Sequence, residues 1–214
     1  VEYEDITSTQ IDVAFEISDC PNVPELVGAY AVIWTTTPWT IPVNQALAFN
    51  PAFEQVSYEA CYGVFKGSDG RRYVLSQALA SDFAKRANLE LELESALSDE
   101  ALVGAIARHP MHHLGGFYAE PRPFLPHDFL TTESGPGLVH MAPDHGEDDF
   151  DLCKTHGINP KFVVDAGGVY KDDWLWLGAD DVDADGKPRR RAVINANFNA
   201  PDGPICSDLR EARA

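Results

Sequence analysis

The order of apolar and polar residues predicts strands through most of the first half of the chain. Residues 11–17 alternate apolar and polar side chains, which is the period of a half-buried strand. Residues 29–34 form a continuous apolar run, as expected of a strand that is covered on both faces. Three further segments favour strands by composition or alternation, namely 55–61, 71–75 and 89–94.

Two segments have the signals of helices. Residues 77–87 carry apolar side chains at helical spacing, and Asn88 is a suitable residue to end that helix. Residues 137–142 read as a strand, and a short helix follows over 147–156, where acidic residues crowd a first turn that the helix dipole favours. Gly157 is placed to end it.

The remaining segments have little periodicity. Residues 108–136 are rich in Pro, His and Gly and indicate loops with short strands between them, and residues 178–214 are expected to be largely irregular. The sequence therefore predicts a mixed α+β fold with a strand-rich, barrel-like core. We expect residues 1–214 to form a single domain, excised from a longer protein.

Charge and composition narrow the classes of function. The chain has 16 basic and 34 acidic residues, a net charge of −18, which argues against an autonomous nucleic-acid binder. No apolar run approaches the length of a membrane helix, and the acidic start of the chain is unlike a signal peptide. The basic cluster at Lys187 and 189–191 is either a solvated loop or a contact for a phosphate group of a partner.

The cysteines do not indicate a secreted framework. They are far apart and form no CxxC pair, so we expect free thiols and a cytoplasmic location. They are Cys20, Cys61, Cys153 and Cys206.

Two segments concentrate groups that can do chemistry. The first comprises Thr35, Thr36, Thr37, Pro38, Trp39 and Thr40. Side chains alternate along a strand, so threonines at its end place hydroxyls on both faces, beside an aromatic wall. The run is either a hydrogen-bonding cluster of a binding site or merely a packed turn, because threonine favours strands in any case.

The second segment is Gly135-Pro-Gly-Leu-Val-His-Met-Ala-Pro-Asp-His-Gly-Glu-Asp-Asp149. It places the imidazole of His140 on a strand and the carboxylate of Asp149 in the first turn of the following helix. His140 is either a ligand group or a hydrogen-bonded core histidine, and Asp149 either a ligand group or a residue that satisfies the helix dipole. His145 reads as a turn residue.

A metal site is not indicated. His109, His112 and His113 lie close together, but no HExxH and no paired Cys/His spacing is present. The sequence also lacks phosphate-binding glycine loops and the GxSxG motif of serine hydrolases. We expect no metal and no cofactor for this domain.

These two segments carry a family resemblance. TTTPWTIPVNQALAFNP, GPGLVHMAPDHGEDDF and GINPKFVVDAGGVY resemble the editing insertion of isoleucyl-tRNA synthetases, and the likeness covers nearly the whole chain. Leucyl and valyl relatives typically have an arginine after the two threonines and a different residue where His140 stands. Pro136 departs from the family, which often has threonine there.

The resemblance implies a β-barrel-containing α+β domain, inserted into the catalytic domain of a class I synthetase that uses ATP and Mg. The HIGH and KMSKS signatures of that catalytic domain are absent, so no ligase activity is expected of this segment. The implied function is hydrolysis of valyl-tRNA(Ile) or valyl-adenylate. The implied partners are the valine-bearing 3′ end of tRNA(Ile) and the rest of the synthetase, with no membrane and no DNA.

The resemblance also implies residue roles. Asp149 would hold the α-ammonium of the misattached amino acid, and Thr36, Thr37 and Asn44 would position water or the carbonyl. Substrate-binding residues would be Thr35, Trp39, Asn44 and His140. Two alternatives remain open, a catalytically silent insertion that guides tRNA and an unrelated metal-dependent hydrolase.

Overall fold

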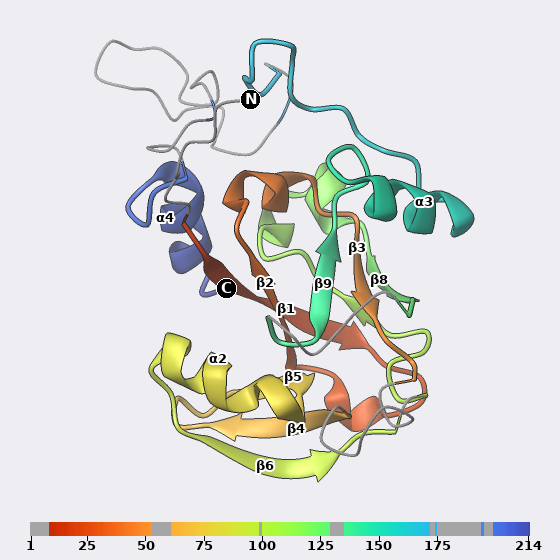
Figure 1. Cartoon of the computed structure of the whole chain (residues 1–214), viewed down its shortest axis with the longest axis vertical. Coiled ribbons are helices and arrows are strands. Elements are labelled where there is room, and N and C mark those ends of the chain that lie inside the picture. Colours follow the sequence, from red (N-terminus) through yellow and green to blue (C-terminus); the bar gives the residue numbers. More distant parts are fainter. Residues whose placement is uncertain are drawn as a thin grey trace, which may run out of the picture.

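Strands dominate the described part of the chain, and short helices join them (Figure 1). The computed structural model describes residues 9–52, 61–98, 100–128, 135–171, 174, 194 and 199–214. In chain order, with η marking 3-10 helices, the elements are β1 (Ile11–Asp19), η1 (Pro24–Leu26), β2 (Tyr30–Thr35), η2 (Pro38–Val43), β3 (Ala46–Phe49), β4 (Tyr62–Gly67), β5 (Arg72–Ser76), η4 (Gln77–Leu79), α2 (Ala80–Ala87), β6 (Leu91–Ala96), β7 (Ile106–Ala107), η5 (His112–Leu114), η6 (Gly116–Ala119), β8 (Arg122–Pro126), β9 (Leu138–Met141), α3 (Glu147–Thr155) and α4 (Pro204–Glu211).

Six of these strands close into a barrel, which confirms the predicted α+β fold. Around the barrel they follow the order β1, β7, β8, β3, β9 and β2, and β2 pairs again with β1 to complete the ring. The antiparallel β1–β2 pair, in register from Ile11↔Thr35 to Glu16↔Tyr30, is the longest contact in the ring. Closure leaves no free sheet edge along these strands.

A second layer grows from the same sheet. β5 pairs with the beginning of β2 in parallel, and β4 and β6 extend the sheet beyond β5. α2 lies across this extension, below the barrel in the view of Figure 1. The helix ends where predicted, because Asn88 adopts the left-handed conformation with φ 53°.

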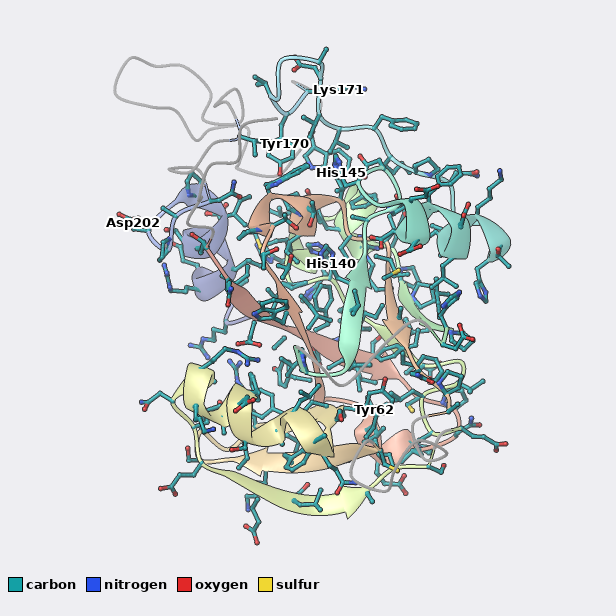
Figure 2. The ribbon with its side chains drawn as sticks, viewed as in Figure 1. Tyr62, His140, His145, Tyr170, Lys171 and Asp202 are labelled. Atoms are coloured by element: carbon teal, nitrogen blue, oxygen red, sulfur yellow. The ribbon has the colours of Figure 1, made fainter. Side chains whose placement is uncertain are left out.

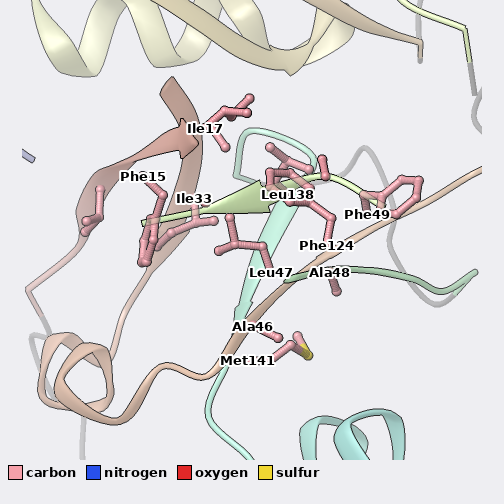
Figure 3. Packing of buried hydrophobic residues seen from close by; sticks show 14 of the residues in the cluster. Phe15, Ile17, Ile33, Ala46, Leu47, Ala48, Phe49, Phe124, Leu138 and Met141 are labelled. Carbon is pink, nitrogen blue, oxygen red and sulfur yellow. The ribbon is translucent and has the colours of Figure 1, made fainter. Parts of the chain in front are cut away.

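The barrel interior is apolar, as the alternation in the sequence predicts. In β1 the side chains of Val13, Phe15 and Ile17 are buried, while their neighbours are only partly buried. Figure 3 shows Phe15 packed with Ile33 and other buried side chains from β3, β8 and β9. Burial of these side chains supplies the main favourable free energy of the fold.

The continuous apolar run of β2 is covered on both faces, as predicted. Ile33 belongs to the core cluster of the barrel. Val32, its neighbour on the opposite face, belongs to a second cluster with Tyr73 of β5 and Phe83 of α2. One strand therefore forms part of both layers.

Most predicted elements are present, with some shifts. The strand predicted at 55–61 lies outside the described residues except for Cys61, and the strand observed nearby is β4. The predicted strands 71–75 and 137–142 correspond to β5 and β9. The helix predicted at 147–156 is α3, and Gly157 follows it with φ 74°.

The tail is less irregular than predicted. Residues 204–211 form helix α4, where Pro204 occupies the first helical turn. Ile205, Cys206 and Leu209 are buried along one side of this helix. The short apolar spacing escaped the sequence analysis because neighbouring Gly, Pro and Asp residues suggested a loop.

The structure also bears on the predictions about membrane helices and cysteine thiols. Among the described helices, none combines the length and apolarity that crossing a membrane requires. All four cysteines are buried free thiols.

Candidate functional site

The two chemically rich segments meet because of how β2 and β9 pair. The two strands run parallel through the pair Ile33↔Leu138, so their carboxyl ends point to the same end of the barrel. The threonine run leaves β2 at that end, and the Ala-Pro-Asp-His turn leaves β9 there. This is the kind of strand end at which ligand groups converge in other folds.

A chain of hydrogen-bonding groups joins the threonine run to β9. The hydroxyls of Thr35 and Thr37 lie 3.1 Å apart, and that of Thr37 lies 3.4 Å from Thr40 Oγ1. Thr40 Oγ1 lies 3.2 Å from Nε2 of His140. Thr40 is therefore the residue that connects the threonine run to His140.

The tautomer of His140 follows from the hydrogen bond that Thr40 donates. Thr40 Oγ1 donates its hydrogen to the carbonyl of Thr37 at 2.9 Å, so it accepts from Nε2–H of His140. Burial lowers the pKa of His140 to about 4, with a further contribution from nearby His145, so the ring is neutral at neutral pH. Nδ1 is consequently a bare acceptor, buried and without a hydrogen-bond partner among the described residues.

Asp149 lies in the first turn of α3, as predicted. Its Oδ2 accepts the backbone N–H of Ala142 at 2.7 Å, which ties the helix to the end of β9. Burial raises the pKa of this carboxyl, and Asp148 adds to the rise, whereas the Ala142 N–H and His145 oppose it. The side chain is only partly buried, and no hydrogen bond from the described residues reaches its other oxygen.

An aromatic wall stands beside this carboxylate. The rings of Trp39 and His145 meet edge to face, with centroids 4.4 Å apart. The hydroxyl of Tyr170 donates to the carbonyl of Trp39, and Asn199 Oδ1 accepts its N–H at 3.1 Å. In the view of Figure 2, His145 lies between Tyr170 and His140. Sequence analysis missed Tyr170 and Asn199 because they are more than 100 residues distant.

His145 has more contacts than a turn residue requires. Its backbone N–H closes the predicted turn by donating to Ala142 at 2.9 Å. Its Nε2 lies 3.1 Å from Oδ2 of Asp144, whose side chain is only 2% exposed. The two groups are in close contact, but they form no hydrogen bond with each other.

Two of the predicted residues occupy different surroundings. Asn44 is fully buried, and its Nδ2 donates to the carbonyl of Ala46, so it shapes the turn into β3. Its Oδ1 has no hydrogen-bond partner among the described residues. Thr36 is half-buried and makes no side-chain hydrogen bond within the described part of the chain. The catalytic and binding roles of both remain predictions.

Pro136 lies in the loop that leads into β9. Pro136 lies between Gly135 and Gly137, whose φ angles of 75° and 86° suit glycine. The Pro136 carbonyl accepts the backbone N–H of Ser76 at 2.8 Å. The loop is thereby held against the end of β5.

The other histidines do not form a metal centre. His109 is fully buried, donates through Nε2 to Ile41 and accepts the N–H of Met111 at Nδ1. Burial, with a contribution from Arg122, lowers its pKa well below the usual value, so it is a neutral core histidine. Among the described residues, no group of three or more His, Cys, Asp or Glu side chains could hold a metal. The basic cluster at 187–191 lies outside the described residues.

The assembled site has a definite chemical character. A carboxylate with one open oxygen can hold an ammonium group by a charge-assisted hydrogen bond. Hydroxyls and a neutral imidazole lie across the same end of the barrel and can orient a neutral polar ligand. No strong nucleophile is part of this arrangement.

Comparisons with known proteins agree on one group of enzymes. The chain is 49% identical to isoleucine–tRNA ligase of Zymomonas mobilis over 216 residues, which cover 100% of this chain and 21% of that protein. It is 40% identical to isoleucine–tRNA ligase of Gluconobacter oxydans, again over 100% of this chain and 21% of the relative. The enzyme of Saccharophagus degradans is 39% identical over 81% of this chain and 18% of its own length. The chain thus spans about a fifth of the relatives it matches.

A solved structure shares the fold of this chain. The crystal structure of GlLeuRS-CP1 superposes with a TM-score of 0.59 at 16% identity, over 96% of this chain and 94% of the other. No family model matches the chain.

Proposed function

The chain is homologous to one segment of isoleucine–tRNA ligases and has the fold of synthetase editing domains, and we propose on this basis that it hydrolyses valyl-tRNA(Ile). The substrate is the ester that joins valine to the 3′ end of the tRNA. Valyl-adenylate is a second substrate of the same site. The rest of the synthetase supplies the tRNA-binding surface that a domain of net charge −18 lacks.

One observation carries the proposal. At the shared end of β2 and β9, the partly open carboxylate of Asp149 is bonded to the backbone of Ala142, two residues beyond His140, where the hydrogen-bonded groups from Thr35 meet β9. A free α-ammonium distinguishes an aminoacyl ester from an uncharged tRNA. Asp149 is the carboxylate that binds this ammonium.

The reaction itself needs little chemical assistance. An aminoacyl ester is already activated, so correct placement of water and carbonyl supplies much of the acceleration. Hydroxyl and backbone groups near Thr36 and Thr37 orient the water and stabilise the developing oxyanion. Neither a metal nor a cofactor takes part in this domain, and the enzyme acts in the cytoplasm.

Selectivity comes from exclusion. Isoleucine and valine differ by one methylene, which is worth only about 1–3 kcal/mol in an apolar pocket, and isoleucyl-tRNA synthetase is itself the standard example of that limit. A second site that rejects the larger side chain removes the error. His140 and Trp39 form the wall that the extra methyl group of isoleucine would meet.

The decisive experiment replaces the ammonium-binding carboxylate in the intact protein. Asp149→Ala should reduce valyl-tRNA(Ile) deacylation at least about 100-fold, because an orphaned substrate charge costs several kcal/mol, while isoleucine activation is retained. Asp151→Ala is the matched control, since Asp151 is exposed on the same helix. Unchanged deacylation by Asp149→Ala would refute the role of Asp149 in binding the ammonium group.

A further inference from the structure

Asp144 and His145 form a pair that the proposed reaction does not use. The Asp144 side chain is 2% exposed, its Oδ2 faces His145 Nε2 at 3.1 Å, and its Oδ1 has no hydrogen-bond partner among the described residues. Burial of a carboxylate is costly unless a cation or donors compensate it. Such a group is expected to serve the site beside it.

His145 contacts the elements on either side of the site. Its ring packs edge to face on Trp39 at 4.4 Å, and its side chain is 16% exposed. It is also near enough to act electrostatically on both His140 and Asp149. The pair therefore lies between the aromatic wall and the carboxylate of Asp149.

The hydrogen bonds that Trp39 makes with Tyr170 and Asn199 involve its backbone. Tyr170 binds its carbonyl and Asn199 its N–H, and neither bond restrains the two side-chain torsions of the indole. The His145 ring packs against the indole and so restrains these torsions, and the buried Asp144 carboxylate faces that ring at 3.1 Å.

We infer that Asp144 and His145 act as positioning residues that fix the Trp39 ring and so set which amino-acid side chains the site admits. The inference rests on the proposed editing function. The pair does not contact the reacting atoms. Its loss should therefore change selectivity more than the rate with the small substrate.

The test compares deacylation of valyl-tRNA(Ile) and isoleucyl-tRNA(Ile) by the intact protein. His145→Ala should lower the valine-to-isoleucine ratio of kcat/KM about tenfold, the scale of one methylene in a pocket. Most of the change should appear as faster isoleucyl-tRNA hydrolysis, and the valine kcat should stay within about threefold. Asp144→Asn should shift the ratio in the same direction, and His145→Gln, which keeps a donor for Asp144, should shift it less.

The matched control is a second His–Asp pair on the surface. His127 Nδ1 lies 3.4 Å from Asp128 Oδ1, and the two side chains are 40% and 92% exposed. His127→Ala should leave the ratio unchanged. A ratio within twofold of the parent for His145→Ala, with both tRNAs hydrolysed normally, would overturn the inference.

Two further measurements separate positioning from a general loss of structure. If His145 acts through Trp39, the double variant His145→Ala/Trp39→Leu should match Trp39→Leu alone; additive effects would refute it. In protein labelled with 5-fluorotryptophan, His145→Ala should move the Trp39 fluorine resonance, assigned by loss of the signal in Trp39→Phe. If the Trp39 resonance did not move, His145 would not position Trp39, whether or not the protein hydrolyses either tRNA. If the parent hydrolysed neither tRNA, the proposed function would be refuted, and the resonance would still test the inference.

Discussion

The two ends of β2 lie in regions that differ in how far their polar side chains are buried. At its beginning, β2 joins the layer of β4, β5, β6 and α2, where charged side chains are exposed or at the rim, as in the pair Lys85–Asp82. At its end lie buried polar atoms that lack hydrogen-bond partners among the described residues, including His140 Nδ1 and Asp144 Oδ1. The second layer also has one such atom, Gln77 Nε2, among the described residues, but several lie together at the β9 end. Unsatisfied buried groups reduce stability, so this grouping marks the region that serves a ligand.

The second layer is built for stability in the ordinary way. Phe83 and Tyr73 pack edge to face at 5.4 Å, under the helix. The hydroxyl of Tyr73 donates to Asp69 at 2.6 Å, and burial together with that carboxylate raises the pKa of Tyr73 to about 12. All seven histidines of the chain lie outside residues 61–98. Four predictions test whether the second layer affects stability alone while the β9 end of the barrel also affects deacylation.

The largest effect is expected from truncation of the barrel core. Phe15→Ala should lower the free energy of unfolding by about 3–5 kcal/mol, because the side chain is fully buried and leaves a cavity. Deacylation should fall with it, since β1 supports β2. Phe83→Ala, in the second layer, should destabilise by about 3 kcal/mol and leave the kcat of the folded protein unchanged. Urea denaturation and deacylation assays check both, and a loss of kcat in Phe83→Ala would break the comparison.

Acid should destabilise the protein through the buried histidines near the site. His140 has a folded pKa of about 4, below its unfolded value of 6.5, so its contribution is complete above pH 6.5 and is lost as the pH falls towards 4. The slope for one such histidine is at most about 1.4 kcal/mol per pH unit. His109, lowered in the same direction, adds to the loss.

The measurement is the free energy of unfolding at pH 7, 6, 5 and 4. His140→Gln should flatten the curve between pH 6.5 and 4. His156→Gln, at an exposed position, should leave its slope unchanged. If the free energy of unfolding had the same pH dependence in the parent and in His140→Gln, the pKa of His140 would be the same in the folded and unfolded protein.

Thr40 should matter more than its neighbours in the threonine run. Thr40→Val removes the acceptor of His140 Nε2–H and the donor to Thr37, at a cost of about 1–2 kcal/mol in unfolding free energy. We expect deacylation to fall about tenfold as His140 loses its orientation. Thr155→Val, which removes an exposed helical hydroxyl, is the control. If Thr40→Val kept the activity of the parent, the hydrogen-bonded hydroxyls of the threonine run would have no part in catalysis.

The smallest effect is expected from the ion pair at the rim of the second layer. Arg86 binds Asp12 through two hydrogen bonds of 2.7 and 2.8 Å, and the arginine side chain is 33% exposed. Arg86→Ala should cost about 0.5–1 kcal/mol and change neither kcat nor selectivity. A shift in the valine-to-isoleucine ratio would connect the two regions through β1.

Local patterns in the sequence determined the elements and the two functional segments. Alternation in β1, the apolar run of β2 and the acidic first turn of α3 were recognisable because side-chain period and helix dipole act within a few residues. The same reasoning identified the threonine run, His140 and Asp149 as candidates. It did not predict β4, and it missed α4, whose apolar face is short and surrounded by turn residues.

Only the tertiary structure decided which of these candidates meet. Parallel pairing of β2 with β9 brings Thr40 to His140 across 100 residues, and no local pattern encodes that distance. The fold also buries the Asp144 carboxylate beside His145, so a sequence that reads as a turn places this His–Asp contact against Trp39. Burial and proximity are properties of the closed barrel, and they determine the pKa, the hydrogen-bond partners and the reach of each side chain.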